Sequence, residues 1–386
     1  MITVQNADKA LKEYYLQAIA AQLNDNISPF YSAIEKTAEN VYGKDVSISV
    51  MRNSTDCVTA CDENADLPEP HQNRYLKISV PLKNIYGTIQ VSDKALRASR
   101  DSSGAFVNLV NAEMEGLVSG AKFNFQRMLY GDGTAKICTI SAVVASSDNL
   151  KFTVDNASGL SVGMIVDVIL ADGTRTDKVK VEAVDASAKQ VTLNTAITGT
   201  VKDAIIAKTG AYNNELTGLG AIFGSGTLYG YDRTAEPYFK PYSARVAAST
   251  DITEDKLVEI LDEMEENYNS KINMILCSYG TRRKIASLAA VNKTIVNSID
   301  AHTGYGVVTV NSVPVYADRF CPDNMVYFVN TDDFVLSQLC DWEWLEDEDG
   351  KILKQVPGKA AYSATLVKYA NLICKKPCGQ AVLTIG

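Results

Sequence analysis

Histidine is almost absent from the sequence: the chain has two, His71 and His302, among 386 residues. Histidine is the most frequent general base and metal ligand near neutral pH, so its scarcity leaves little room for Ser–His–Asp catalysis or a histidine-built metal centre. His71 follows an acidic, proline-bearing stretch, and His302 precedes a Gly-Tyr-Gly stretch; both settings are typical of loops. We interpret both histidines as exposed loop residues rather than catalytic groups.

Short motifs that carry catalysis are missing as well. The sequence has no phosphate-binding G-x-x-x-x-G-K-[ST], no G-x-S-x-G elbow and no H-E-x-x-H. Gly218, Gly220 and Gly224 miss the dinucleotide-binding spacing by one residue and do not follow a clear strand. We therefore expect a protein that is not an enzyme, with no catalytic residues, no cofactor-binding residues and no metal ligands.

Long apolar runs are also absent. No window approaches the ~18 apolar residues of a membrane span, and residues 1–9 lack the apolar core of a signal peptide. We therefore expect synthesis and folding in the cytoplasm, without a membrane partner. The formal net charge is −9 and the isoelectric point is about 5.0. An acidic chain repels a phosphate backbone, which disfavours tight sequence-specific binding of nucleic acid.

Cysteine is present, with eight residues, and two pairs are spaced four apart: Cys57/Cys61 and Cys374/Cys378. Zinc sites usually need four ligands, and neither histidine lies at ligand spacing from either pair. We interpret the cysteines as reduced thiols, some buried as small apolar residues, and the role of the two pairs stays open. The acidic run 343–349 lacks the alternating ligands and central glycine of a calcium loop, so a solvated turn is the better interpretation.

The first 95 residues change from helical to alternating patterns. Apolar residues spaced three and four apart predict a helix over 8–24, and Ser28 followed by Pro29 predicts the start of a second helix. Alternation of apolar and polar residues then predicts three strands, at 46–50, 75–80 and 87–91. The first two strands enclose an acidic tip at 61–70, so we expect a long hairpin with a broad loop. Because a lone hairpin is marginal in water, it must lie on its own chain or on a neighbour.

The next segment contains the longest helical pattern. Apolar residues spaced 4, 4, 3, 4, 4 and 3 predict one helix over 102–129, roughly 40 Å long, which glycines end after Tyr130. Residues 138–208 differ in composition and contain five or six short β-runs with turn residues between them, which favours a small barrel or sandwich. Glycines flank this segment on both sides, so we interpret it as an inserted domain.

Helix and strand alternate again in the last part. Thr253 is expected to cap a helix, 272–277 is expected to be a buried strand, and 279–291 is expected to be a helix with a basic face. Further strands are expected in the remainder of the chain, at 307–310, 313–316, 325–330, 361–375 and 381–385, and the stretch 339–345 holds both tryptophans. The fold class is therefore α+β.

This order of parts resembles the tailed-bacteriophage major capsid proteins with the Hong Kong 97 fold. Three stretches strengthen the resemblance: 123–133 looks like the end of that family's spine helix, 218–223 looks like the return to the main fold, and 364–372 looks like a closing strand. The resemblance covers essentially the whole chain outside the insertion. It implies seven parts: an N-terminal helical arm, 1–45; an extended loop hairpin, 46–95; a peripheral domain with the spine helix, 96–137; an inserted β-barrel or sandwich, 138–210; a return segment, 211–250; an axial domain, 251–340; and terminal strands of the peripheral domain, 341–386.

The resemblance also implies a function and partners. The chain is expected to self-assemble into pentamers and hexamers of an icosahedral phage head around double-stranded DNA, without sequence-specific binding, and to reside in the virion after assembly in the host cytoplasm. Relatives suggest a portal and a decoration protein as partners. Because the long helix begins near residue 102, we expect a separate scaffolding protein rather than a fused one. Lys77 and Lys83 are interpreted as solvated lysines rather than crosslinking residues.

Subunit contacts are the only site that we predict. They are expected at the acidic tip and at the basic helix, on Asp62, Glu63, Asp66, Arg282, Arg283 and Lys284. Three alternatives remain. An encapsulin-type bacterial nanocompartment shares the fold but houses an enzyme. A carbohydrate- or receptor-binding β-domain explains the insertion alone. An enzyme has little support from the motifs.

Overall fold

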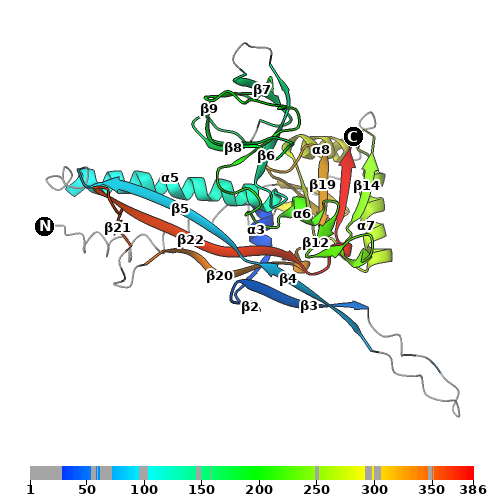
Figure 1. The fold of residues 1–386 in the computed structure, drawn as a ribbon. Helices are drawn as coiled ribbons and strands as arrows, with labels where there is room; N and C mark the ends of the chain where they lie inside the picture. Colours follow the sequence, from blue (N-terminus) through cyan, green and yellow to red (C-terminus); the bar gives the residue numbers. More distant parts are fainter. Residues whose placement is uncertain are drawn as a thin grey trace.

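The computed structural model describes residues 28–53, 58, 60, 72–94, 103–144, 149–157, 159–247, 252–291, 298–299, 306–346, 350 and 352–386. Within these residues an elongated body carries a long hairpin at one end and a β-barrel on one side (Figure 1). The predicted helix 8–24 and the tip 61–70 lie outside the described residues. In the described part of the chain, no helix is long and apolar enough to cross a membrane.

The long helix and the sheet beneath it form the centre of the body (Figure 1). Helix α5 (Ser103–Tyr130) agrees with the predicted helix within one residue at each end. It packs against a five-stranded sheet of β1 (Glu35–Thr37), β20 (Phe334–Trp344), β22 (Ala361–Cys374), β21 (Lys354–Gln355) and β5 (Lys83–Ser92). Phe125 and Leu129 of α5 are fully buried in a core that also contains Trp342 and Leu366 of the sheet. The apolar stripe of the helix therefore faces this sheet.

Helix α3 (Pro29–Ala33) begins where the sequence predicts. The Ser28 hydroxyl accepts a hydrogen bond from the Tyr31 amide at 3.2 Å, and Pro29 occupies the first turn. The expectation of a helical arm over 1–45 is wrong for the residues after α3. Residues 35–37 form β1, which pairs in parallel with β20, and 41–42 form the short strand β2 (Val41–Tyr42). The open edge of β20 satisfies the backbone groups of 35–37, which overrides the helical pattern.

The hairpin consists of β3 (Asp45–Asn53) and β4 (Arg74–Pro81), extended by β2 at its base. The two strands pair from Asp45↔Pro81 to Asn53↔Arg74. The third alternating run is not part of this hairpin, although 46–95 was predicted as one unit. It forms β5, which pairs antiparallel with β22 over ten residues. Its apolar face, with Ile89 and Val91, is buried.

A closed six-stranded barrel follows α5. Its strands are in the order β10-β7-β6-β11-β8-β9, with bounds β6 (Lys136–Val143), β7 (Lys151–Val154), β8 (Ile165–Ile169), β9 (Arg175–Asp185), β10 (Gln190–Leu193) and β11 (Ile205–Lys208). Its core is separate from that of the body and contains Phe152, Val168, Val181 and Ile206. Of the two architectures left open by the sequence, the barrel is the one observed.

Short elements lead from the barrel to a second, seven-stranded sheet. They are α6 (Leu219–Ile222), β12 (Thr227–Leu228), β13 (Tyr231–Asp232) and a 3-10 turn, η2 (Pro237–Phe239). The sheet has the order β14-β23-β19-β15-β18-β17-β16. Its strands are β14 (Tyr242–Val246), β15 (Met274–Cys277), β16 (Ser298–Ile299), β17 (Gly306–Val310), β18 (Val313–Ala317), β19 (Met325–Val329) and β23 (Ala381–Ile385). The 3-10 turns η3 (Thr331–Asp333) and η4 (Pro377–Gly379) adjoin this sheet in sequence.

Helices α7 (Glu254–Tyr268) and α8 (Tyr279–Val291) cover one face of the seven-stranded sheet. Leu257, Ile260 and Met264 of α7 and Ile285 of α8 share a core with the strands. The opposite face contributes Met274, Leu276 and Val382 to the core around α5. One sheet thus joins the two helices to the body.

The last 50 residues cross between the two sheets, which corrects two expected assignments. Strand β20 was placed partly in an axial domain ending at 340, but all of it pairs with β22 in the sheet under α5. Strand β23 was placed with the peripheral strands of 341–386, but it lies between β14 and β19 of the seven-stranded sheet. The pairing partner of a strand is decided by residues far away in sequence, and the strand's own pattern does not encode it.

Candidate subunit interface

The neck is our name for the two chain segments, 131–135 and 208–217, that join the barrel to α5. These segments bond to each other: the amides of Lys208, Asn213 and Glu215 donate to carbonyls of 133–135 at 3.2–3.3 Å. Gly133 in the neck adopts a φ of +88°, which suits glycine. The barrel is therefore held on a base of two hydrogen-bonded segments.

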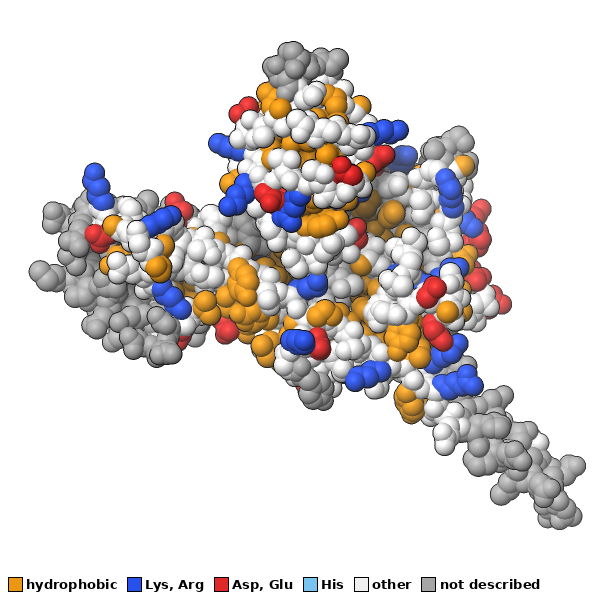
Figure 2. Space-filling model, in the orientation of Figure 1, with side chains coloured by type: hydrophobic (Ala, Val, Ile, Leu, Met, Phe, Trp, Pro, Cys, Tyr) orange, Lys and Arg blue, Asp and Glu red, His pale blue; other side chains and the backbone are white. Residues whose placement is uncertain are grey.

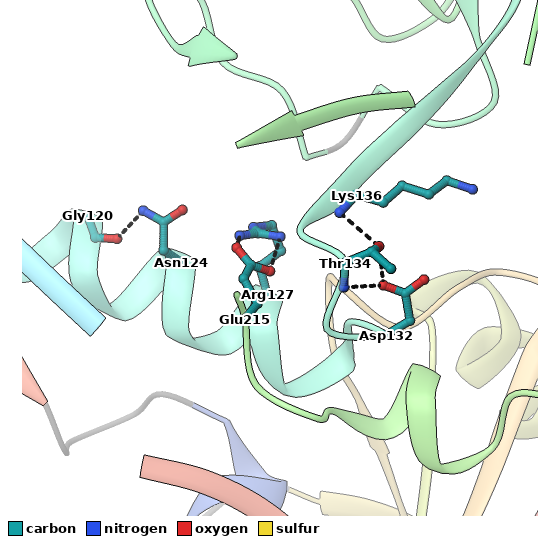
Figure 3. Close-up of polar contacts among 7 residues, drawn as sticks. All are labelled: Gly120, Asn124, Arg127, Asp132, Thr134, Lys136 and Glu215. Atoms are coloured by element: carbon teal, nitrogen blue, oxygen red, sulfur yellow. Dashed lines mark hydrogen bonds and ion pairs between the residues drawn. The ribbon is translucent and has the colours of Figure 1, made fainter. Parts of the chain in front are cut away.

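A buried ion pair reinforces the neck (Figure 3). Arg127, in the last turn of α5, donates to both carboxylate oxygens of Glu215, with Nη1 3.0 Å from Oε2 and Nη2 bonded to Oε1. Their side chains are 7% and 2% exposed. The sequence offered no local sign of this pair, because the two residues are 88 positions apart.

Two stretches singled out in the sequence meet at the same place. Gly218 lies against the carbonyls that end α5: a Cβ on it would come within 2.4 Å of the Met128 oxygen and 2.5 Å of the Gly131 oxygen. Only glycine allows this approach without moving backbone. The end of α5 and the segment that leads from the neck into α6 thus pack closely because Gly218 has no side chain.

A second buried charge lies under α5. The Lys368 side chain of β22 is fully buried, and its ammonium donates to Gln338 Oε1 at 2.9 Å and to Asp341 Oδ1 at 2.5 Å. It also lies 5.6 Å from the ring centroids of Phe125 and Trp342. Burial lowers the pKa of Lys368, and the Asp341 carboxylate opposes that shift. These contacts connect β20, β22 and α5, so the charge serves the packing of the body.

A groove beside α5 is large enough to hold a small ligand. Its volume is about 500 Å³, and Tyr86, Gly116, Gly120, Asn124 and Trp342 are among its lining residues. The Asn124 amide is turned back onto the helix, donating to the Gly120 carbonyl at 2.8 Å (Figure 3). Glu215, which also lines the groove, is the partner of Arg127. Lys208 also lines the groove, and burial lowers the pKa of its ammonium.

No group of three or more potential metal ligands occurs among the residues that the structure describes. Cys374 is buried and Cys378 is half-buried, and burial raises the pKa of both thiols. Both are free thiols in the structure, while Cys57, Cys61 and both histidines lie outside the described residues.

The hairpin exposes large apolar side chains near its far end. Met51 and Tyr75 are Cα partners across β3 and β4 and are 49% and 64% exposed. Closer to the body, Val46, Val50 and Ile78 are buried in the main core. Arg52 is tied to Glu236 at 3.2 Å, and the Tyr231 hydroxyl donates to the Lys77 carbonyl at 3.0 Å. The hairpin is thus anchored at its base and leaves apolar surface open further out.

Of the six predicted contact residues, the structure places three. Arg282, Arg283 and Lys284 are exposed and consecutive on α8, and the Arg282 guanidinium lies 5.5 Å from the Tyr279 ring centroid. Asp62, Glu63 and Asp66 lie outside the described residues, so their contact with the basic helix stays a prediction. An acidic face on α7 was not predicted, although the helical spacing of its Asp and Glu residues is visible in the sequence.

The architecture defines a class of protein. A long helix on a sheet, a projecting hairpin and a second lobe are arranged as in the capsid chain of Cyanophage A-1(L), which is 13% identical and matches with a TM-score of 0.52 over 92% of each chain. A weaker similarity is found to the capsid of an empty GTA particle, which is 11% identical and matches over 94% of this chain and 90% of that chain with a TM-score of 0.49. Another is to the holo-SrpI encapsulin of Synechococcus elongatus PCC 7942, which is 10% identical and matches over 93% of this chain and 88% of that chain with a TM-score of 0.46. The Hong Kong 97 fold predicted from the sequence is thereby confirmed.

The family comparison makes the class more specific. Residues 182–351, less than half of the chain, match the model of the SU10 major capsid protein family. A search of curated proteins gave no match. The family match and the fold together support a structural capsid protein.

Proposed function

We propose that the chain self-assembles into the pentamers and hexamers of an icosahedral phage head that encloses double-stranded DNA. The observation that carries this proposal is the hairpin, which exposes Met51 and Tyr75 although Arg52 and Lys77 beside them are tied to the body. Apolar side chains and strand edges that one subunit leaves open become buried when a neighbour covers them. Rings built from unlike patches close by rotation and can tile a shell.

The proposal extends to partners and location. A separate scaffolding protein and a portal would guide assembly in the host cytoplasm, and the finished chain would reside in the virion. A decoration protein is a further partner in this proposal. Packaged DNA would meet a wall in which each chain has a formal net charge of −9, and this supports containment without sequence-specific binding.

Negative-stain microscopy of the expressed chain tests this function. We expect closed shells or rings of five and six subunits, and particles isolated from infected cells should contain nuclease-protected DNA. Persistent monomers, with or without the scaffolding protein, would contradict the proposal. Particles filled with one enzyme instead of DNA would favour the encapsulin-type alternative.

The predicted acidic tip has its own test. Reversing the charges of Asp62, Glu63 and Asp66 to lysine should impair assembly, because the tip is proposed to meet a basic patch on the next subunit. Normal yields of particles from this triple variant would remove the tip from the interface without affecting the capsid proposal.

A further inference from the structure

Helix α7 carries an acidic face that, apart from Glu259, forms no ion pair with the described residues. Asp255, Glu259, Asp262 and Glu266 are spaced 4, 3 and 4 apart and are all exposed. They lie opposite the buried stripe of α7, so they form one outward row. Acidic side chains gather along α7 at the right edge of the molecule in Figure 2.

Partners for this row are scarce among the described residues. Glu259 pairs with Lys256 at 2.6 Å, and no ion pair is found there for Asp255, Asp262 or Glu266. Like charges four residues apart destabilise an isolated helix. The row therefore raises the free energy of a lone subunit, and an external cationic surface would lower it.

Helix α8 supplies a cationic surface of matching size. Arg282, Arg283 and Lys284 are exposed, and within the described part of the chain none of them forms an ion pair. Tyr279 beside them is 54% exposed, which adds an aromatic surface of the kind enriched at interface hot spots. The two helices thus carry opposite charges, and no ion pair joins them among the described residues of one subunit.

The order of the strands in the seven-stranded sheet places the acidic row and the basic triplet towards different edges of that sheet. Helix α7 lies between β14, at one edge of the seven-stranded sheet, and β15 in the middle, and α8 lies in the chain between β15 and β16, which forms the other edge and is parallel to β15. Both connections join parallel strands and run in the same direction, so right-handed crossovers place both helices on one face. The acidic helix therefore lies towards the β14 edge and the basic helix towards the β16 edge.

We propose that the acidic row of α7 binds the basic triplet of α8 on the next copy of this chain. In a head-to-tail ring, one edge of each subunit faces the opposite edge of its neighbour, so unlike charges at opposite edges would meet at every contact. The pairing would set the orientation and rate of ring closure. This inference rests on the proposed function as a ring-forming capsid protein and names a contact within it.

Charge reversal and charge exchange test the proposal on the full chain. One variant carries D255K, D262K and E266K, a second carries R282E, R283E and K284E, and a third carries all six changes. A matched control for the α8 reversal, K151E, K180E and K202E, alters the total charge by the same amount and sign on exposed barrel residues. Assembly is followed by light scattering and microscopy at low and high salt, and circular dichroism of the subunits checks folding.

We expect each three-residue reversal to slow assembly at low salt by about tenfold or more. The six-residue exchange should restore the rate to within a few-fold of the original, and the barrel control should change it little. High salt should reduce the difference in assembly rate between the original chain and each reversal, because ions screen both the attraction and the repulsion between the two surfaces.

Two results would overturn the inference while leaving the capsid function intact: normal assembly of either reversal, or rescue of the α8 reversal by D62K, E63K and D66K in the tip but not by the α7 changes. If the unaltered chain forms no rings or shells, both the inference and the proposed function fail. A reversal that does not fold is replaced by the charge-removing set D255N, D262N and E266Q, which should slow assembly to a smaller extent.

Discussion

Arg127 and Glu215 illustrate how single residues hold distant parts of the chain together. Both side chains are almost fully buried, and their ion pair joins the last turn of α5 to the neck. A buried ion pair adds little net stability compared with an apolar pair, but removing one partner leaves the other charge uncompensated. The pair therefore acts mainly as a positioning contact.

We expect E215Q to lower the free energy of unfolding by about 3–5 kcal/mol, because Arg127 then stays buried without a countercharge. Replacing both residues, as R127M with E215L, should recover most of the loss. The exposed pair of Lys256 and Glu259 is the control, and E259Q should cost less than about 1 kcal/mol. Urea denaturation of unassembled subunits measures all three, and equal costs for E215Q and E259Q would contradict this account.

Asp318 gives a pH-dependent link between α5 and the seven-stranded sheet. Its carboxylate accepts hydrogen bonds from Gln126 Nε2 at 2.7 Å and from the Phe320 amide at 3.0 Å. Burial nevertheless raises the pKa of Asp318 above its usual value of 3.8. The folded chain thus holds the proton more tightly than the unfolded chain does.

The sign of the effect follows from this shift. Stability gained from the protonated Asp318 is fully present below pH 3.8 and is lost as the pH rises through the higher folded pKa. The original chain should therefore lose stability relative to D318N as the pH rises above 3.8 and through the folded pKa of Asp318. Urea titrations of both chains at several pH values measure the difference, and a constant difference across this range would argue against the effect.

At the scale of elements, the barrel behaves as a unit of its own. Its buried residues form a core distinct from that of the body, and its connections to α5 all pass through the neck. Asp167 inside the barrel accepts from the amides of Lys178 and Gly210 and pairs with Arg175, which fastens the exit segment to the barrel wall. Few contacts beyond the neck are needed for its stability.

We expect residues 134–214, expressed alone, to fold cooperatively. The fragment contains the whole barrel core and two of the three hydrogen bonds of the neck, from Lys208 to Ala135 and from Asn213 to Thr134. A single thermal transition, with near-ultraviolet dichroism from a fixed environment of Tyr212 and Phe152, would show this. A broad, non-cooperative transition would mean that the body is required for the barrel to fold.

Elements were predictable from the sequence where local pattern decides the structure. The α5 stripe and the Ser28 cap needed only residues a few positions apart, and both appear in the structure. Strand partners were not predictable in this way. Strands β1, β5 and β23 have ordinary strand patterns or none. Their partners lie far along the chain, since Glu35 pairs with Val335, Ser92 with Ala361 and Tyr242 with Ala381, so a local pattern could not assign them to a sheet.

The same limit applied to the candidate interface. The basic triplet on α8 was readable as three consecutive residues, and the acidic row of α7 was readable from its helical spacing once the helix was accepted. Their positions at opposite edges of a sheet required the order of the strands. The Arg127–Glu215 pair and the fit of Gly218 required the three-dimensional path of the neck.

At the scale of the whole molecule, the hairpin is the part that extends furthest from its own core (Figure 1). Its base shares the main core through Val46 and Ile78, whereas Met51 and Tyr75 lie largely in solvent. Removing residues 54–73, between the two strands, should therefore leave the subunit stable and remove the acidic tip that is proposed to contact a neighbour.

We expect replacement of residues 54–73 by Asn-Gly to leave the free energy of unfolding within about 0.5 kcal/mol and to abolish closed shells. Asn53 and Arg74 are already paired across the ladder, and Asn-Gly suits the tight turn between such strands. Denaturation and microscopy measure the two effects separately. Shells of normal yield from this variant would show that the outer hairpin is dispensable.

The neck has a practical consequence for engineering. Since the chain leaves and re-enters the body through two hydrogen-bonded segments, the barrel can be exchanged for another compact domain whose termini are adjacent. Each assembled copy would then present one guest domain at a regular spacing, on a base that resists tilting. The neck is therefore a site at which guest domains can be attached to the capsid chain for multivalent display.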